Sequence, residues 1–184
     1  MLKILKVGIW FVMDSLEAIV FVGSIYMVVY IFLFQPGKVV GASMQPTLHT
    51  NERFVTDKVV YKLHPPERGD IVVLNSLEGT EVELIKRVVG LPGERVSLKD
   101  GSVYINGKKL NEQYTPSQTY WYESDKNEDP NYFVEVPPGS VFVLGDHREV
   151  SKDSRVFGPV PLENIVGRAD FRYYPTNKIR TLFP

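Results

Sequence analysis

The sequence contains no cysteine and no excess of charge of either sign. The missing cysteines exclude disulfides, a thiol nucleophile, and zinc or iron–sulfur sites built on cysteine. The 21 Lys and Arg nearly balance the 22 Asp and Glu, so no strong field points to a nucleic acid partner. The three histidines, His49, His64 and His147, show no metal-ligand spacing, and we predict neither a metal nor another cofactor.

Apolar residues are plentiful: they make up 43% of the 184 residues, which allows one domain of ordinary size plus an appendage. Residues 18–34 form a run of seventeen residues without charge. A membrane-spanning helix needs about 20 apolar residues, and tilting or flanking aromatics cover the shortfall. A cleaved secretory signal would end in small residues, whereas residues 32–36 are bulky. We therefore predict an uncleaved membrane anchor over residues 1–36, with its span at about 18–34.

The charges around this run predict its orientation. Lys3 and Lys6 precede it, so the positive-inside rule keeps the N-terminus in the cytoplasm and places the rest of the chain outside. Residues 8–13 extend the span only if Asp14 and Glu17 lie at the membrane interface.

Beyond the anchor, short strand-like segments alternate with turn signals. Residues 71–74 and 140–144 are apolar runs typical of buried strands, and residues 103–110 predict a hairpin with Asn106 and Gly107 at its tip. Short strands at this spacing predict a mainly β domain.

We assign this domain to residues 37–184. Residues 113–135 within it are polar and aromatic without a clear period, and we interpret them as an irregular insertion.

A candidate nucleophile, Ser43, lies in the stretch GASMQPTL at residues 41–48. Pro46 fixes its own φ and restrains Gln45 to extended geometry, so the segment is stiff. Stiffness presents a hydroxyl without the entropy of a mobile loop, and Gly41 lets another backbone come close. Taken alone, the stretch also fits a linker between anchor and domain.

A candidate base lies in residues 81–89. A period of two places Lys86 on one face with three apolar residues, Val82, Leu84 and Val88. The opposite face carries two acidic residues and Arg87 and is predicted to be solvated. An ammonium on an apolar face loses hydration, its pKa falls, and a neutral lysine can accept a serine proton. The alternative is a lysine with a buried stem and a hydrated head.

A third stretch, residues 145–155 (GDHREVSKDSR), follows a predicted buried strand and is dense in hydroxyls and charges. Such loops are usually solvated. Asp146 and His147 also allow a Ser-His-Asp triad with Ser43. Neighbouring side chains on an extended segment point in opposite directions, which makes direct orientation of His147 by Asp146 awkward, but a distant Asp could serve.

Together, the anchor and these stretches resemble the type I signal peptidase family in its short, Gram-positive-like form. The shared motifs occur in one order: SMQPTL at 43–48, RGDIVV at 68–73, KRVVGLPGE at 86–94, and GD with SxDSR between 145 and 155. The resemblance covers nearly the whole chain and implies the mainly β signal-peptidase fold with one N-terminal transmembrane helix.

The resemblance also implies roles for the residues. Ser43 would be the nucleophile, Lys86 the general base, and Ser151 the hydroxyl that positions the amine. The residues implied to hold the loop are Asp153 and Arg155, with Arg87 and Asp146 in support. The residues expected to shape the site are Gly41, Met44 and Pro46.

Three positions depart from the family pattern. His147 and Val150 stand where many members have Asn. Gly41 replaces a serine of some members, so the oxyanion hole would rest on the Ser43 N–H and on a further backbone or water donor.

The implied function is that of a membrane-bound serine endopeptidase that removes N-terminal signal peptides from secreted preproteins through an acyl-enzyme. Its anchor would lie in the lipid bilayer of a bacterial cytoplasmic membrane, and its catalytic domain would act on the outer face, near the secretion translocon. Its substrates would have small residues before the cut. One alternative is a self-cleaving Ser–Lys regulator, which would need a DNA-binding domain and an internal cleavage site. The other is a catalytically silent, membrane-tethered binding domain, against which the serine, the lysine and the 151–155 loop together argue.

Overall fold

The computed structural model describes residues 2–76, 82–129 and 131–182. The chain divides into two compact units, Met1–Gln35 and Pro36–Pro184.

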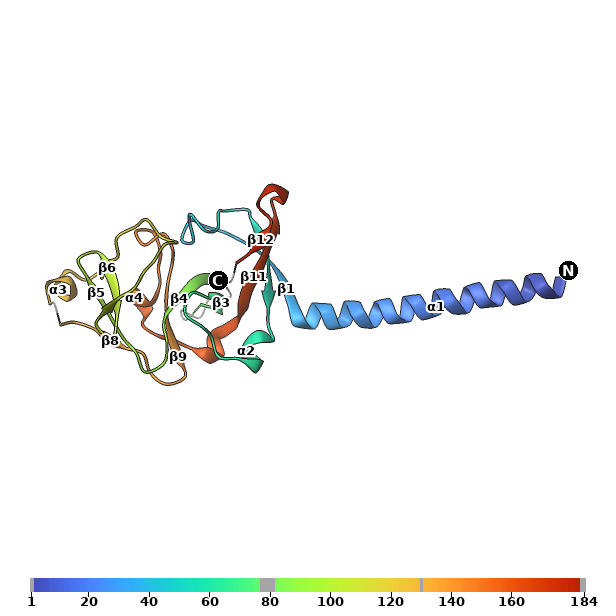
Figure 1. Cartoon of the computed structure of the whole chain (residues 1–184), viewed down its shortest axis with the longest axis horizontal. Coiled ribbons are helices and arrows are strands. Elements are labelled where there is room, and N and C mark those ends of the chain that lie inside the picture. Colours follow the sequence, from blue (N-terminus) through green and yellow to red (C-terminus); the bar gives the residue numbers. More distant parts are fainter. Residues whose placement is uncertain (1, 77–81, 130, 183–184) are drawn as a thin grey trace. The chain divides into compact units, whose positions relative to one another are not determined.

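The first unit is built from helix α1, Leu2–Leu33 (Figure 1). Within the described ranges, Gly8–Tyr30 is the one helical segment that is long and apolar enough to span a membrane. It begins earlier than the span expected at 18–34 and contains Asp14 and Glu17. Phe34, the last residue of that expected span, belongs to a strand.

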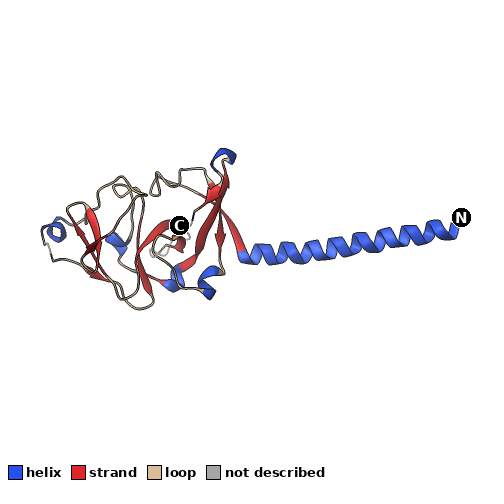
Figure 2. Cartoon of the chain, viewed as in Figure 1, coloured by secondary structure: helices blue, strands red, loops and turns tan. Residues whose placement is uncertain are grey.

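Strands dominate the second unit, as Figure 2 shows, and the prediction of a mainly β fold is confirmed. The larger sheet has eight strands in the order β1 (Phe34–Lys38), β2 (Arg53–Asp57), β11 (Ile165–Tyr174), β3 (Ile71–Asn75), β4 (Glu83–Gly90), β9 (Ser140–Leu144) and β10 (Val160–Pro161), with β12 (Arg180–Thr181) on β11. The smaller sheet has the order β7 (Lys108–Lys109), β6 (Ser102–Ile105), β5 (Arg95–Lys99) and β8 (Val134–Glu135). Short helical segments connect them: α2 (Val60–Leu63), α3 (Ser124–Glu128), α4 (Ser154–Phe157), and the 3₁₀ turns η1 (Leu162–Asn164) and η2 (Thr176–Lys178).

The hairpin predicted at residues 103–110 is confirmed. Strands β6 and β7 pair antiparallel, with Ile105 opposite Lys108. Asn106 and Gly107 between them both have positive φ, 50° and 79°, which a two-residue turn of the I′ type requires. The segment interpreted as an insertion, 113–135, contains α3 and ends in β8; residue 130 lies outside the described part.

Strand β3 has two buried faces because it lies inside the larger sheet, between β11 and β4. Ile71 and Val73 belong to one apolar cluster, while Val72 and Leu74 belong to another. Because successive side chains along a strand point to opposite faces of the sheet, β3 contributes residues to two apolar clusters. This is why residues 71–74 are an unbroken apolar run.

Candidate active site

The loop that carries Ser43 connects β1 to β2, and its conformation is set by the core. Met44 and Leu48, with exposed fractions of 2% and 0%, pack in the apolar cluster that includes Phe54 and Val73. The Leu48 amide donates to the Met44 carbonyl at 2.8 Å, which closes a turn between the two anchors. Ser43, next to the first anchor, remains partly exposed.

Two of the predicted site-shaping residues, Gly41 and Pro46, lie at exposed positions of this loop. Gly41 is exposed and has a φ of +97°, a left-handed conformation that favours glycine, and its carbonyl accepts a bond from Thr50 Oγ1 at 2.7 Å. Pro46 is exposed, and its peptide bond with Gln45 is cis. Met44, the third, is a core residue.

Lys86 and Ser43, forty-three positions apart in sequence, meet in space. Lys86 Nζ lies 3.0 Å from Ser43 Oγ and also donates to the Ile85 carbonyl at 2.9 Å. The lysine side chain is buried, at 3% exposure, in a strand whose register places it opposite Val72. Burial lowers the pKa of Lys86 from 10.5 to about 8, against the opposing pull of the Asp153 and Asp146 carboxylates.

The predicted burial of Lys86 is therefore confirmed, but its neighbours differ in part from those expected. Leu84 and Val88 share its face of β4 and contact the core cluster around Val72. Val82 precedes the strand and is 59% exposed, so it does not cover the lysine. Glu81, the first residue of the predicted strand, lies outside the described residues.

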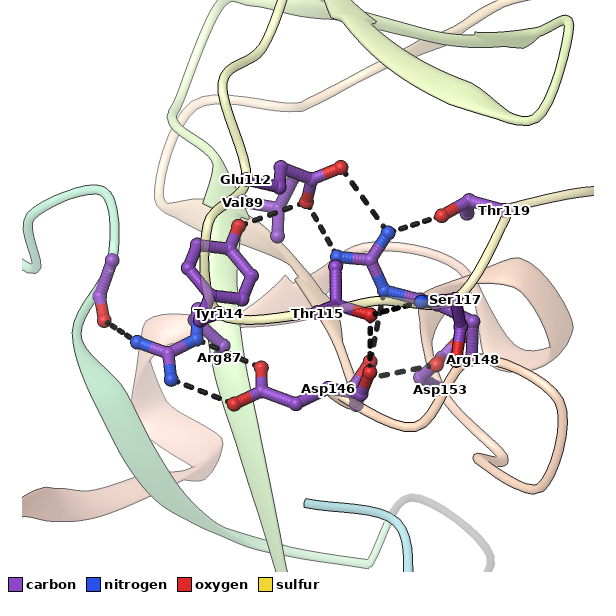
Figure 3. Close-up of polar contacts among 12 residues, drawn as sticks. Arg87, Val89, Glu112, Tyr114, Thr115, Ser117, Thr119, Asp146, Arg148 and Asp153 are labelled. Atoms are coloured by element: carbon purple, nitrogen blue, oxygen red, sulfur yellow. Dashed lines mark hydrogen bonds and ion pairs between the residues drawn. The ribbon is translucent and has the colours of Figure 1, made fainter. Parts of the chain in front are cut away.

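The prediction that Arg87 lies on a solvated face is wrong. Strand β9 pairs with β4 from Arg87 onward, which covers this end of the strand on both sides, and Arg87 is 6% exposed. Its charge is compensated by Asp146, whose carboxylate accepts from Nε at 2.8 Å and from Nη2 at 2.7 Å (Figure 3). A bidentate pair of this kind is the geometry in which a buried arginine is tolerated.

The same carboxylate reaches the nucleophile loop. Thr47 Oγ1 donates to Asp146 Oδ2 at 2.5 Å, and Arg87 Nη1 donates to the Gly69 carbonyl at 2.7 Å. Asp146 thus joins the end of β9, strand β4 and the Ser43 loop.

A main-chain contact joins the Ser43 loop to the 145–155 loop directly. The His147 amide donates to the Ser43 carbonyl at 3.0 Å. Gly145 lies against this contact, and a Cβ on it would be 2.5 Å from the Ser43 carbonyl oxygen and would overlap Ser151 Oγ. Only glycine fits where these two loops meet.

Asp153 and Arg155 organise the rest of that loop. The Asp153 carboxylate caps α4 and accepts from the Gly145 amide at 3.0 Å and from Arg155 Nε at 2.8 Å. Both side chains are buried, at 0% and 6% exposure. The ion pair therefore fixes the loop internally and compensates both of these buried charges.

Ser151 is placed close to this assembly but is not bonded to the lysine. Its side chain is fully buried, and its Oγ has no hydrogen-bond partner among the described residues. Its expected role in positioning the amine is thus not visible as a contact.

The alternative triad lacks its geometry in the described part of the chain. His147 Nδ1 is buried there without a hydrogen-bond partner, so no carboxylate orients the imidazole through that atom. The ring cannot be held as a triad requires.

Three residues that the sequence did not single out also hold the loop. Arg148, 1% exposed, donates to Glu112, to Thr119 Oγ1 and, at 2.9 Å, to the Gly145 carbonyl (Figure 3). Arg148 lies in the charge-rich stretch, but composition could not tell a buried charge from a solvated one. Glu112 and Thr119 carry no sequence signal.

An apolar cleft of about 310 Å³ opens beside the Ser43–Lys86 pair. Its apolar lining residues are Val39, Val40, Met44, Phe54, Val73, Val82, Leu84 and Ile85. Within the described ranges, no group of His, Asp and Glu side chains could hold a metal ion.

Comparisons with known proteins agree on one family. The family described as signal peptidase, peptidase S26, matches residues 12–174. Signal peptidase I T of Bacillus subtilis (strain 168) is 40% identical over 167 residues, covering 89% of this chain and 86% of its own. Signal peptidase IB of Staphylococcus aureus (strain COL) is 35% identical over 184 residues, covering 92% and 95%. The crystal structure of a signal peptidase I from Enterococcus faecalis V583 is 33% identical and covers 57% of this chain and 97% of that one, with a TM-score of 0.44.

With the family match extending over most of the sequence, the chain belongs to the signal peptidase family, peptidase S26, and is a serine endopeptidase.

Proposed function

We propose that this chain removes N-terminal signal peptides from secreted preproteins, with Ser43 as nucleophile and Lys86 as general base. The observation that carries this proposal is the 3.0 Å contact between Lys86 Nζ and Ser43 Oγ, made by a buried lysine with a pKa of about 8. A lysine with this pKa is neutral in an appreciable fraction near neutral pH, and a neutral amine accepts the hydroxyl proton.

The reaction then follows in two halves. Ser43 Oγ attacks the scissile carbonyl carbon while its proton passes to Lys86 Nζ. The resulting ammonium returns that proton to the leaving amine as the peptide bond breaks, which leaves an ester on Ser43. Lys86, neutral again, takes a proton from a water molecule as the water oxygen attacks the ester. It then returns this proton to Ser43 Oγ as the bond to the acyl carbon breaks and the acid product leaves. The Ser43 N–H supports the oxyanion, because Gly41 offers no side-chain donor.

The cleft beside the pair offers the substrate an apolar wall, lined by Met44 and Phe54 and by Leu84 and Ile85 from β4. The preference for small side chains before the cut is what the resemblance to type I signal peptidases implies. In the described residues, β9 pairs with β4 only from Arg87 to Gly90. The preceding edge of β4 therefore offers main-chain groups to which an extended peptide can add as a strand.

The test of this function is cleavage of a preprotein by the detergent-solubilised full chain, beside a Ser43→Ala control. We expect the wild type to release the mature protein and Ser43→Ala to release none. A second substrate, with Phe in place of the alanine before the cut, should not be processed. Equal cleavage by the wild type and Ser43→Ala would refute Ser43 as the nucleophile.

The pH dependence of kcat/KM should follow the deprotonation of Lys86. The base must be neutral and its pKa is about 8, so the rate should rise with pH through that value and level off above it. At pH 6 we expect about one hundredth of the plateau rate, because that fraction of the amine is neutral. A midpoint near 6.5 would indicate a histidine base instead.

We also propose that α1 holds the enzyme in a bacterial cytoplasmic membrane, close to the translocon, with a single span and the catalytic unit outside. The support is the 23-residue candidate span Gly8–Tyr30, which follows Lys3 and Lys6 in the sequence. A C-terminal reporter that is active only in the cytoplasm should give no signal, and one that is active only outside the cytoplasm should give a signal. Strong activity of the cytoplasmic reporter would contradict this orientation.

A further inference from the structure

Residues 112–122 lie along the 145–155 loop and contact it at several points. Figure 3 shows Glu112 and Thr119 meeting Arg148, and Thr115 meeting the end of β9. Thr115 Oγ1 donates to the Asp146 carbonyl at 2.6 Å. Residues 113–122, part of the segment interpreted above as an insertion, and Glu112 before them therefore support the 145–155 loop.

The end of this segment is rigidly held. Trp121 is 4% exposed and packs edge-on against Phe142, with ring centroids 6.1 Å apart. The side-chain amide of Asn127, in α3, bonds both main-chain groups of Trp121: it accepts from the amide at 2.9 Å and donates to the carbonyl at 2.8 Å. The backbone that leads into Tyr122 is thus fixed on both sides.

Tyr122 is half exposed, at 50%, yet its hydroxyl has a specific partner. It donates to the main-chain carbonyl of Ser151, which also accepts from Arg155 Nη2 at 3.3 Å. The guanidinium of Arg155 stacks over the Tyr122 ring at 4.7 Å. Loss of hydration raises the pKa of Tyr122, so the hydroxyl remains a donor over the working pH range.

Ser151 needs such external support. Its buried Oγ has no hydrogen-bond partner in the part of the chain that the structure describes, so its side chain has no bond of its own to fix it there. Its place in the site then depends on its backbone, and the Ser151 carbonyl is the point at which Tyr122 and Arg155 hold that backbone.

We infer that Tyr122 is a positioning residue for the peptidase reaction, and that it acts through Ser151 by fixing the Ser151 main chain beside the Ser43–Lys86 pair. The inference rests on the function proposed above. Tyr122 would touch neither the substrate nor the reacting atoms.

The charges around the pair predict how the pH profile responds. Asp153 and Asp146 are the charged groups that act on Lys86, and Arg155 and Asp153 are those that act on Tyr122. Asp153 keeps its ion pair with Arg155 when the tyrosine hydroxyl is removed. Burial lowers the pKa of Lys86 while both carboxylates raise it, so water admitted by a looser Ser151 should raise that pKa.

The test compares Tyr122→Phe with Tyr120→Phe. Both tyrosines have similar exposure, 50% and 47%, but among the described residues the Tyr120 hydroxyl bonds the nearby Gln118 side chain alone, at 3.0 Å. Tyr122→Phe keeps the ring over Arg155 but removes both bonds of the hydroxyl, the one it donates to the Ser151 carbonyl and the one it accepts from Arg155 Nη2 at 3.4 Å. This should lower kcat about fivefold to tenfold, with KM unchanged. Its pH midpoint should move upward, its melting temperature should fall by no more than a few degrees, and Tyr120→Phe should match the wild type throughout.

A double mutant separates action through Ser151 from a general structural effect. In a Ser151→Ala background, Tyr122→Phe should change kcat no further, because the Ser151 hydroxyl, which the fixed main chain positions, has gone. Additive losses, an unchanged kcat and pH midpoint in Tyr122→Phe, or equal losses in Tyr120→Phe would each overturn the inference. If the wild-type enzyme cleaved no preprotein, the proposed function itself would be refuted.

Discussion

A Lys86→Met variant is expected to fold, to be more stable than the wild type at neutral pH, and to cleave no preprotein. Methionine keeps the length and bulk of the buried stem but cannot take the proton from Ser43, so the rate should fall by roughly 10² to 10⁴ or more. Asp146 and Asp153 keep their own arginine partners, so the lost ammonium leaves neither carboxylate unpaired.

The gain in stability follows from the same burial. A pKa that falls from 10.5 to about 8 on folding costs about 3 kcal/mol when the amine is protonated in both states. This cost is fully present below about pH 8 and disappears as the pH rises toward 10.5, so the variant's advantage should shrink over that range. Thermal unfolding at pH 7 and at pH 10 measures it.

Two further variants decide whether Lys86 is the base. Lys86→Arg should be inactive, because a guanidinium does not deprotonate at working pH. His147→Asn should remain active, since no carboxylate orients the His147 ring through its buried Nδ1 in the described residues. An active Lys86→Met together with an inactive His147→Asn would assign the base to histidine.

Gly145→Ala is expected to damage both stability and catalysis. The new Cβ would lie 2.5 Å from the Ser43 carbonyl oxygen and from Ser151 Cβ, and a main-chain atom cannot rotate away. Overpacking of this kind costs about 1–3 kcal/mol, and a displacement of Ser43 by about 1 Å can cost a hundredfold in rate. We expect kcat to fall about a hundredfold in the fraction that folds.

Gly90→Ala is the matched control for this substitution. Its Cβ would also clash, at 2.6 Å from Val96 Cγ2 and 2.9 Å from Phe142 Cβ, but in the apolar core away from the nucleophile. It should lower the melting temperature while the folded enzyme keeps its kcat. If Gly145→Ala retained wild-type kcat, the loops would be less tightly joined than their contacts indicate.

The sequence predicted the parts of the site that follow a local rule. The period of two placed Lys86 on an apolar face, and the buried strands 71–74 and 140–144 followed from their composition. It misplaced Arg87 because the pairing of β9 with β4 is a long-range contact, and a strand pattern cannot show where a second neighbour begins to cover it.

The contacts between residues 112–122 and the 145–155 loop could not be predicted from the sequence for the same reason. Arg148 meets Glu112 across 36 positions, and Tyr122 meets Ser151 across 29, so no local period or motif links them. These residues become neighbours only when the chain folds and the segment 112–122 packs against the 145–155 loop.

The burial of Met44 and Leu48 means that the nucleophile cannot be withdrawn without partial unfolding. Lifting this loop away from the core would expose both side chains, at a cost of about 3–6 kcal/mol. Such an enzyme has no inactive conformation of low free energy in which the fold is kept and the serine is hidden. Its output in the cell would then be governed by how much folded protein exists and by how fast substrates arrive, rather than by a zymogen-like switch.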